Sequence, residues 1–196
     1  MSTLNIFTRI ADSFDTCPWG AVSGRRVGRD APPPRFLYTA EERRRRDESR
    51  WTLVQGVLAP VQFAVFLVSL ALVLKFLATG EGLALATASV VVKTFTLYAI
   101  MITGSIWERD VFGRYLFARA FFWEDVVSIV VLALHTAYIV GLMSGALDPT
   151  RQMWLALTAY VSYVINAAQY VLKLRMARRE SAMAMLPGYG TVGYSK

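Results

Sequence analysis

The fold is decided by an uncharged apolar stretch at residues 52–74, which reads TLVQGVLAPVQFAVFLVSLALVL. A helix needs about 20 apolar residues to cross the roughly 30 Å of hydrocarbon in a bilayer. Uncharged stretches of similar length lie at residues 126–147 and 152–172, and a fourth, at 82–107, is interrupted only by Lys93. Backbone amides in lipid must be paired within their own segment, so stretches this long predict helices. The sequence therefore predicts an all-α membrane protein with four transmembrane helices.

Composition and charge agree with this fold and predict its orientation. Hydrophobic residues make up 55% of the 196 residues, and the mean hydropathy is +0.41, both high for a water-soluble domain. Of the 21 Lys and Arg residues, ten precede the first stretch, three lie between the second and third, and five follow the fourth. Short loops rich in Lys and Arg stay in the cytoplasm. We expect an antiparallel N-in/C-in bundle in a lipid bilayer, with no nucleic-acid partner needed to explain the net charge of +7.

The apolar stretches also set the domain boundaries. Residues 38–179 form the predicted four-helix transmembrane domain, and residues 180–196 form a flexible glycine-containing tail. Residues 1–37 are an N-terminal extension. Within it, residues 4–14 have the spacing of a short amphipathic helix, with a frayed tail as the alternative. Prolines and glycines at residues 16–34 predict a linker.

A charged helix is predicted directly before the first span. Thr39 and Glu42 have the spacing of a capping box, in which a hydroxyl at the N-cap is followed by a carboxylate three residues later. The basic run from Arg43 to Arg46 follows. Beside a membrane, such a run is typical of an anchor on anionic lipid headgroups, and a nucleic-acid patch is the weaker alternative. We expect this helix to run straight into the first span.

The densest group of reactive side chains lies between the second and third spans. Residues 107–125 contain four carboxylates and seven aromatic rings. An aromatic belt at the headgroup level explains the rings but not the carboxylates. Acidic residues beside apolar helix ends suit a proton donor, because partial burial favours the protonated form. The candidates are Glu108, Asp110, Glu124 and Asp125, although Asp110 could form a surface ion pair and Asp125 could cap the third helix.

Polar side chains within the spans predict an inward-facing polar surface. Lys93 lies deep in the second span, where a charge costs about 2.5–3.5 kcal/mol, so it must snorkel, pair or lose its proton. His135, the single histidine, lies eleven positions after Glu124 on nearly the same helical face. It could hydrogen-bond across the bundle, bind a pigment's magnesium or relay protons. We expect a polar, aromatic-lined cavity for a flat amphipathic ligand. Other side chains on this surface are Gln55, Gln62, Ser69, Tyr163, Asn166, Gln169 and Tyr170.

Four segments of the chain are long and unusual in composition. They read WTLVQGVLAPVQF at residues 51–63, TGSIWERDVFG at 103–113, FFWED at 121–125 and YVINAAQ at 163–169. These segments closely resemble the 3-vinyl bacteriochlorophyllide hydratase family of phototrophic bacteria, also called 2-vinyl bacteriochlorophyllide hydratase. The resemblance covers residues 38–179 and leaves the N-terminal extension outside.

The resemblance implies an enzyme that adds water to the C3 vinyl group of a chlorophyllide or bacteriochlorophyllide. The product would carry a 1-hydroxyethyl group and serve bacteriochlorophyll a biosynthesis. The implied location is the cytoplasmic or intracytoplasmic membrane of a phototrophic bacterium. The tetrapyrrole substrate carries its own magnesium, no cofactor beyond water is implied, and neighbouring pathway enzymes are candidate partners.

On this interpretation a carboxylic acid protonates the vinyl group, and water captures the resulting cation. Glu124 is the leading acid and Glu108 its partner, with Asp125 or Asp110 able to exchange roles. His135 could bind the substrate's magnesium or position water. An arginine could receive the substrate's propionate. The residues expected to bind substrate are Arg109, Arg114, Gln55, Lys93, Trp107, Trp123, Asn166 and Gln169.

Two other classes of protein remain open from the sequence. A non-catalytic pigment-binding or assembly subunit of a photosynthetic membrane complex would use His135 as a magnesium ligand and would retain its pigment unchanged. A small transporter or channel would line a path with Lys93 and the glutamines. The transporter ranks last, because the sequence has no internal repeat or pair of interrupted helices.

Overall fold

The computed structural model describes residues 37–184, with side chains up to residue 179. This part of the chain is helical and contains no strand. The chain divides into two compact units, one formed by Tyr38–Ala168 and the other by Met1–Leu37 with Gln169–Lys196. The first unit contains most of the side chains that the sequence singles out.

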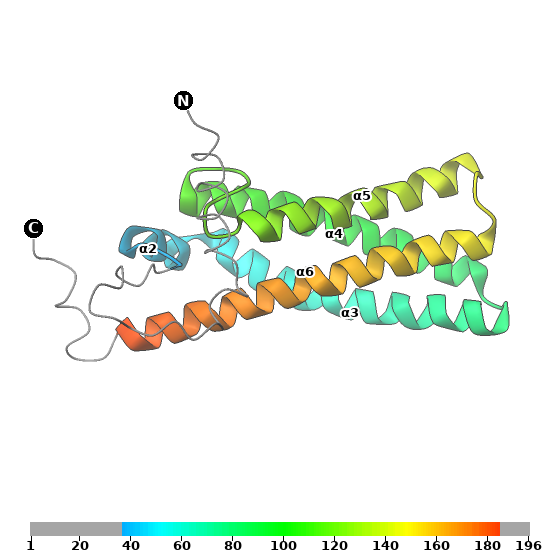
Figure 1. Ribbon diagram of the computed structural model, residues 1–196, viewed down its shortest axis with the longest axis horizontal. Coiled ribbons are helices and arrows are strands. Elements are labelled where there is room, and N and C mark those ends of the chain that lie inside the picture. The colour runs from blue at the N-terminus through cyan, green and yellow to red at the C-terminus, as the bar shows by residue number, and fades with distance from the viewer. Residues whose placement is uncertain (1–36, 185–196) are drawn as a thin grey trace, which may run out of the picture. The chain divides into compact units, whose positions relative to one another are not determined.

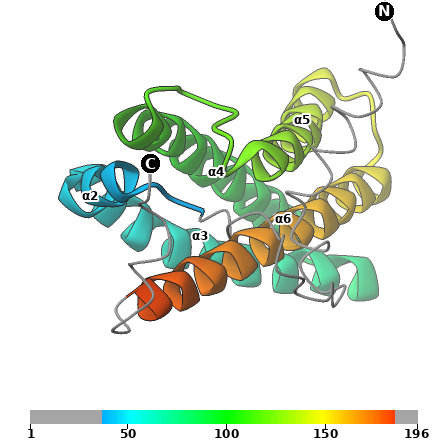
Figure 2. The same ribbon diagram turned by 60° about the vertical axis from the view of Figure 1, so that its left-hand side comes forward.

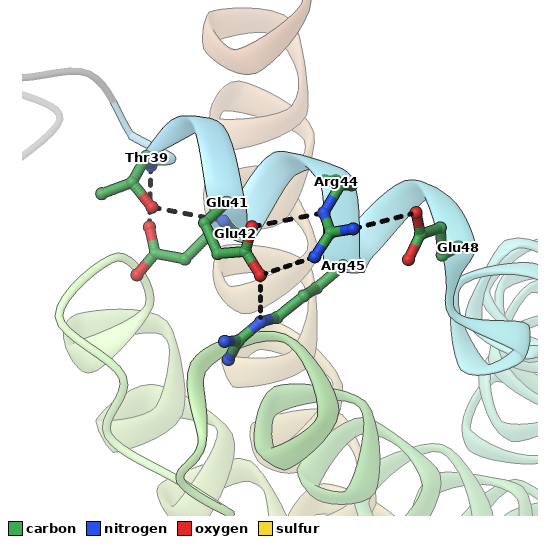
Figure 3. A network of polar contacts seen from close by, with 6 residues as sticks. All are labelled: Thr39, Glu41, Glu42, Arg44, Arg45 and Glu48. Atoms are coloured by element: carbon green, nitrogen blue, oxygen red, sulfur yellow. Dashed lines mark hydrogen bonds and ion pairs between the residues drawn. The ribbon is translucent and has the colours of Figure 1, made fainter.

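The first described helix, α2 (Ala40–Glu48), begins at the predicted capping box. The Thr39 hydroxyl accepts a hydrogen bond from the Glu42 backbone N–H at 3.2 Å, and the Glu42 carboxylate accepts one from the Thr39 N–H at 2.8 Å. Figure 3 shows this box and the ion pairs that Glu41 forms with arginines one turn further along the helix. Hydrogen bonds from these guanidinium groups hold the pKa of the Glu41 carboxyl below its usual value.

The prediction that this helix runs straight into the first span is wrong. α2 ends at Glu48, its C-cap Ser49 has an extended backbone (φ −72°, ψ 127°), and the next helix begins at Arg50. The Ser49 side chain accepts a hydrogen bond from the Trp51 backbone N–H at 3.3 Å. A residue that can cap the following helix therefore interrupts the charged run.

Four long helices follow, and they confirm the four predicted spans. They are α3 (Arg50–Thr79), α4 (Leu83–Phe112), α5 (Phe122–Ser144) and α6 (Pro149–Ala184). Each contains a segment long and apolar enough to cross a membrane. The protein is therefore an all-helical membrane protein in its described part.

Glycines with a left-handed backbone end the first three of these helices. Their φ angles are 75° at Gly80, 76° at Gly113 and 63° at Gly145. The third span was predicted to continue to residue 147, but α5 stops at Ser144 because Gly145 leaves the helical conformation. Pro60 lies inside α3 and does not end it.

The long helices pack through a shared apolar core. Figures 1 and 2 show α3 and α4 side by side, joined by a short connection. In Figure 1 the α3–α4 and α5–α6 connections lie at one end of the helices, and the α4–α5 loop lies at the other. Large apolar side chains on the outer faces are exposed, as expected where helices meet lipid. The core residues include Phe66, Val73, Val90, Leu97, Val131 and Ala156.

Several predictions concern the ends of the chain. The amphipathic helix at residues 4–14 and the linker at residues 16–34 lie outside the described residues. α6 continues to Ala184, into the predicted tail of residues 180–196, and residues 185–196 lie outside the description.

Candidate functional site

Three buried carboxyl groups meet where α4 ends and α5 begins. Glu108 lies near the end of α4, and Glu124 and Asp125 lie in the first turn of α5. They are 4%, 0% and 2% exposed, respectively. The Glu108 side chain hydrogen-bonds with Asp125 and lies close enough to Glu124 for their charges to interact. A hydrogen bond between two carboxyl groups requires a proton, so this carboxyl cluster (Glu108, Glu124 and Asp125) can hold one away from water.

The α4–α5 loop directs two consecutive backbone N–H groups at the carboxyl cluster. Figure 2 shows this loop between the end of α4 and the start of α5. The Phe117 N–H donates to Asp125 Oδ2 at 2.7 Å, and the Ala118 N–H donates to Glu108 Oε2 at 3.3 Å. Phe117 has a φ of 60°, the only positive φ of a non-glycine residue in the described part of the chain. Such a left-handed step costs about 1–2 kcal/mol, and successive N–H groups in such turns bind anions.

Asp125 does not act as the N-cap of the third span. The N-cap position of α5 is Phe121, which makes no side-chain cap. Asp125 instead accepts the N–H of Phe117 from the preceding loop. Its place in the first helical turn still favours negative charge, because the helix dipole is positive there.

Asp110, predicted like Asp125 to be able to exchange roles with Glu124 or Glu108, lies apart from the carboxyl cluster. It is exposed, and its Oδ2 accepts a hydrogen bond from the Ser49 hydroxyl at the junction of α2 and α3. Residues two apart on a helix point to nearly opposite sides, so Asp110 cannot face the same group as Glu108. Its hydrogen bond therefore joins α4 to the junction of α2 and α3.

Two predicted substrate-binding residues lie between α3 and α4. Gln55 Nε2 donates to Thr103 Oγ1 at 2.7 Å, and Trp107 Nε1 donates to Thr52 Oγ1 at 2.9 Å. Both side chains are half-buried. Thr103, Trp107 and Asp110 follow one another at helical spacings of four and three, so they share the face of α4 that meets α3.

Trp107 belongs to a packed group of four aromatic rings. Neighbouring ring centroids in this group lie 5.6–6.2 Å apart. It links the start of α2 to the end of α4 and the start of α5. Trp107 thus belongs to a local aromatic core at the end of the helices where the carboxyl cluster lies. The members are Tyr38, Trp107, Phe112 and Phe121.

A second group of rings faces outward. Phe117 and Phe122 are 38% and 42% exposed, and their ring centroids are 5.6 Å apart. The Trp123 ring lies 5.5 Å from Phe122. Because the Phe117 backbone N–H donates to Asp125, this aromatic row (Phe117, Phe122 and Trp123) lies beside the Asp125 side of the carboxyl cluster. Trp123 is the predicted substrate-binding residue of this row.

The two predicted arginines lie on the surface. Arg109 Nη1 donates to the Tyr115 hydroxyl at 2.5 Å, and its guanidinium lies 4.8 Å from the centre of the same ring. Arg114 is exposed in the α4–α5 loop. A guanidinium that donates to one hydroxyl keeps further N–H donors for an anionic ligand.

A second group of buried polar residues lies in the middle of the helices. Lys93 Nζ lies 3.7 Å from the centre of the Tyr163 ring, and the rings of His135 and Tyr160 are 6.0 Å apart. Lys93 and His135 are close enough to interact electrostatically. His135 Nδ1 lies 2.8 Å from the Val131 carbonyl oxygen. Among residues 37–184, neither Lys93 Nζ nor His135 Nε2 has a hydrogen-bond partner. We call Lys93, His135, Tyr160 and Tyr163 the interior centre.

The interior centre is separate from the carboxyl cluster. His135 follows Glu124 by eleven residues, which is about 16 Å along α5. Lys93 precedes Glu108 by fifteen residues, or about 22 Å along α4. Gln55 contacts α4 at Thr103, ten residues beyond Lys93. The structure therefore distributes the predicted residues over several places along the helices.

The polar residues predicted for the first span differ in their contacts. The Ser69 hydroxyl hydrogen-bonds with Tyr160 of α6 at 2.6 Å and with Ser89 of α4 at 2.8 Å, so it links three helices. Gln62 is also buried, but its amide has no hydrogen-bond partner within the described segment.

The predicted polar face of the fourth span is partly buried. Tyr163 and Asn166 are buried, and Asn166 Nδ2 donates to Ser128 Oγ at 2.8 Å. Tyr170 is 38% exposed. Gln169 is half-buried and begins the other compact unit.

Sequence reasoning missed two residues that the structure brings to these groups. The backbone role of Phe117 had no sequence signal, because left-handed positions are usually marked by glycine or asparagine. Tyr160 could have been found, since it lies three residues before Tyr163 on the same helical face.

Comparison with known proteins identifies the family. Residues 38–176 match the family described as 2-vinyl bacteriochlorophyllide hydratase (BCHF). The chain is 62% identical over 154 residues to the 2-vinyl bacteriochlorophyllide hydratase of Cereibacter sphaeroides, covering 79% of this chain and 96% of that protein. It is 59% identical over 151 residues to the protein of the same name from Rhodobacter capsulatus, covering 77% and 88%. No solved structure matches the chain significantly. The chain therefore belongs to the 2-vinyl bacteriochlorophyllide hydratase family.

Proposed function

We propose that this protein adds water to the vinyl group of a bacteriochlorophyllide-type macrocycle and that the carboxyl cluster carries out the reaction. Relatives named as hydratases, about 60% identical over most of both chains, support the reaction. The observation that carries the assignment of the site is the joint burial of Glu108, Glu124 and Asp125 at the ends of two helices.

Hydration of the vinyl group begins with transfer of a proton to its terminal carbon. The π electrons of the double bond form the new C–H bond, and the adjacent carbon becomes a cation that the macrocycle delocalises. Water then bonds to this carbon and loses a proton to a carboxylate, which gives the 1-hydroxyethyl group. Transfer of that proton to the carboxylate that acted as the acid completes the cycle. The reaction needs an acid, a base and negative charge near the cation.

The carboxyl cluster provides groups for all three requirements. Glu124, with no exposed surface, is the leading candidate for the acid. Glu108 and Asp125 share a hydrogen bond, and one of them is proposed to accept the proton from water. The loop N–H groups of Phe117 and Ala118 support the positions of these two carboxyl groups. Carboxylate charge beside the vinyl group would favour the cation.

The substrate is proposed to bring its own magnesium, with water as the only co-reactant. The vinyl group is attached to the macrocycle that surrounds the magnesium. An axial ligand of the magnesium and the acid that protonates the vinyl group must therefore reach the same macrocycle. His135 lies about 16 Å along α5 from Glu124, which argues against magnesium ligation by His135 while the vinyl group is at Glu124. We propose that the exposed guanidinium of Arg109 or Arg114 receives the propionate.

We place the reaction at the cytoplasmic side of the membrane. The excess of Lys and Arg before α3 and from residue 173 onward supports an antiparallel N-in/C-in bundle. The α4–α5 loop, whose backbone N–H groups donate to Glu108 and Asp125, would then face the cytoplasm. The proposed location is the cytoplasmic or intracytoplasmic membrane of a phototrophic bacterium, where neighbouring pathway enzymes could exchange the pigment.

The proposal is tested with membranes that contain the full chain. Chlorophyllide a, or the corresponding bacteriochlorin, is added, and the pigment is followed by mass and absorption. We expect a gain of one water and a blue shift as the vinyl group leaves conjugation. Glu124→Gln should abolish the gain while pigment still binds, and Asp110→Asn should behave as wild type. Unchanged pigment that copurifies with the wild-type protein in both cases would contradict the proposal and favour a pigment-binding subunit.

A further inference from the structure

Phe117 combines two features, and only its backbone enters the mechanism above. Its φ of 60° turns its own N–H toward Asp125 and the next N–H, that of Ala118, toward Glu108. Glycine adopts this backbone conformation without a steric penalty. The hydrogen bonds to the carboxyl cluster therefore do not require the aromatic ring that this position carries.

The ring of Phe117 lies at the outer edge of the candidate site. The residue is 38% exposed, and its ring contacts Phe122, which is 42% exposed. Phe122 in turn contacts Trp123, the residue before Glu124. The aromatic row thus presents apolar rings beside Asp125, whose carboxylate accepts the Phe117 N–H. Aromatic side chains bind flat conjugated molecules through stacked or edge contacts.

We propose that Phe117 is a substrate-binding residue whose ring contacts the macrocycle while its backbone positions Asp125. This inference rests on the proposed function and deepens it, because it assigns the macrocycle to the outer side of the aromatic row. The vinyl group would then reach inward to the carboxyl cluster. The ring of Phe117 would then bind the macrocycle, and the backbone of the same residue would position a carboxyl group.

Substitutions at Phe117 separate the role of the ring from that of the backbone. Phe117→Gly and Phe117→Leu both remove the ring, but only glycine relieves the left-handed backbone. We expect both to raise the KM for the pigment about tenfold. In both variants the effect on the KM should exceed any effect on kcat, because both keep the backbone N–H that donates to Asp125. Phe117→Tyr should restore the KM.

A binding measurement without turnover makes the test independent of catalysis. The Kd for chlorophyllide a is measured in membranes for Glu124→Gln alone and together with Phe117→Gly or Phe117→Leu. The expected increase is again about tenfold. The control is Phe95→Leu, which removes a ring that is 62% exposed on the outer face of α4 and should leave the Kd unchanged.

Two results would overturn the assignment of Phe117. The first is an unchanged Kd and KM in both ring-free variants. The second is an unchanged Kd with less protein retained in membranes, which would make the ring a lipid anchor. If the wild-type protein fails to hydrate the pigment, the proposed function is contradicted, whereas the Kd values still decide whether Phe117 contacts the macrocycle.

Discussion

The carboxyl cluster and the interior centre both draw on α4 and α5, and the interior centre adds two tyrosines of α6, but they differ in how their polar atoms are surrounded. α4 contributes Glu108 to the first group and Lys93 to the second, and α5 contributes Glu124 and His135. None of these four side chains is more than 4% exposed. The two groups are therefore equally buried, and burial alone does not distinguish a reactive site from a structural one.

The contacts of the two groups do distinguish them. In the carboxyl cluster, a loop outside the helices donates backbone N–H groups to Glu108 and Asp125. In the interior centre, Lys93 Nζ and His135 Nε2 find no hydrogen-bond partner in the described residues, and aromatic rings lie beside them. We infer that the first group is arranged for proton transfer beside a loop that a substrate can reach, and that the second belongs to the packed interior.

The largest expected effect comes from removing the exchangeable protons of the carboxyl cluster. Glu108→Gln and Asp125→Asn keep an oxygen that can accept the loop N–H groups, so the loop should stay in place. Each is expected to lower kcat about 10²–10⁴-fold, the usual contribution of a general acid or base. The double variant should be little worse than the poorer single variant, because residues that act as a unit are not additive.

Conversion of pigment in membranes, followed by mass, measures these rates. Asp110→Asn is the matched control, since Asp110 lies on the same helix but contacts Ser49. If the two losses multiply in the double variant, Glu108 and Asp125 act separately and the shared proton is excluded. If Asp110→Asn loses as much activity as Glu108→Gln, the division between the faces of α4 is wrong.

A smaller effect is expected in the interior centre, where a substitution should raise stability instead of lowering activity. Lys93→Met keeps a side chain of similar length and removes a buried amine that has no acceptor among the described residues. Loss of an unsatisfied buried donor should raise the free energy of unfolding by about 1 kcal/mol, reduced by the lost contact with Tyr163. The rate of hydration should not change.

Unfolding of the purified protein in mixed detergent micelles measures this stability, with Lys75→Met, an exposed lysine on α3, as the control. Loss of hydration by Lys93→Met with stability retained would assign Lys93 to the catalytic site. The distinction between the two groups would then fail.

Local patterns in the sequence predicted much of the fold and part of the site. The uncharged stretches located α3 to α6, and the spacing of Thr39 and Glu42 located the start of α2. Glu108, Glu124 and Asp125 were found because carboxylates at apolar helix ends are unusual. These features depend on residues near one another in the chain, so they can be read without knowing how the helices pair.

What the sequence did not predict depends on contacts between distant segments. Gln55 and Trp107 looked available to a ligand, but each is hydrogen-bonded across the α3–α4 interface. The extended backbone of Ser49 ends α2, and the residues around it in the sequence do not predict this conformation. The separation of Asp110 from Glu108 could have been predicted, because residues two apart on a helix face different directions.

The smallest expected effect concerns the hydrogen bonds that hold the interior centre together. Ser69→Ala removes the partner of the Tyr160 hydroxyl, and Tyr160→Phe removes the hydroxyl itself. Interhelical hydrogen bonds in membranes contribute about 0.6 kcal/mol on average, so Ser69→Ala should lower the free energy of unfolding by roughly that amount. In a double-mutant cycle measured in mixed micelles, the two substitutions should be coupled, because they remove the same bond. Additive losses would show that the bond does not stabilise the fold. A fall in hydration rate with unchanged stability would instead link the interior centre to the reaction.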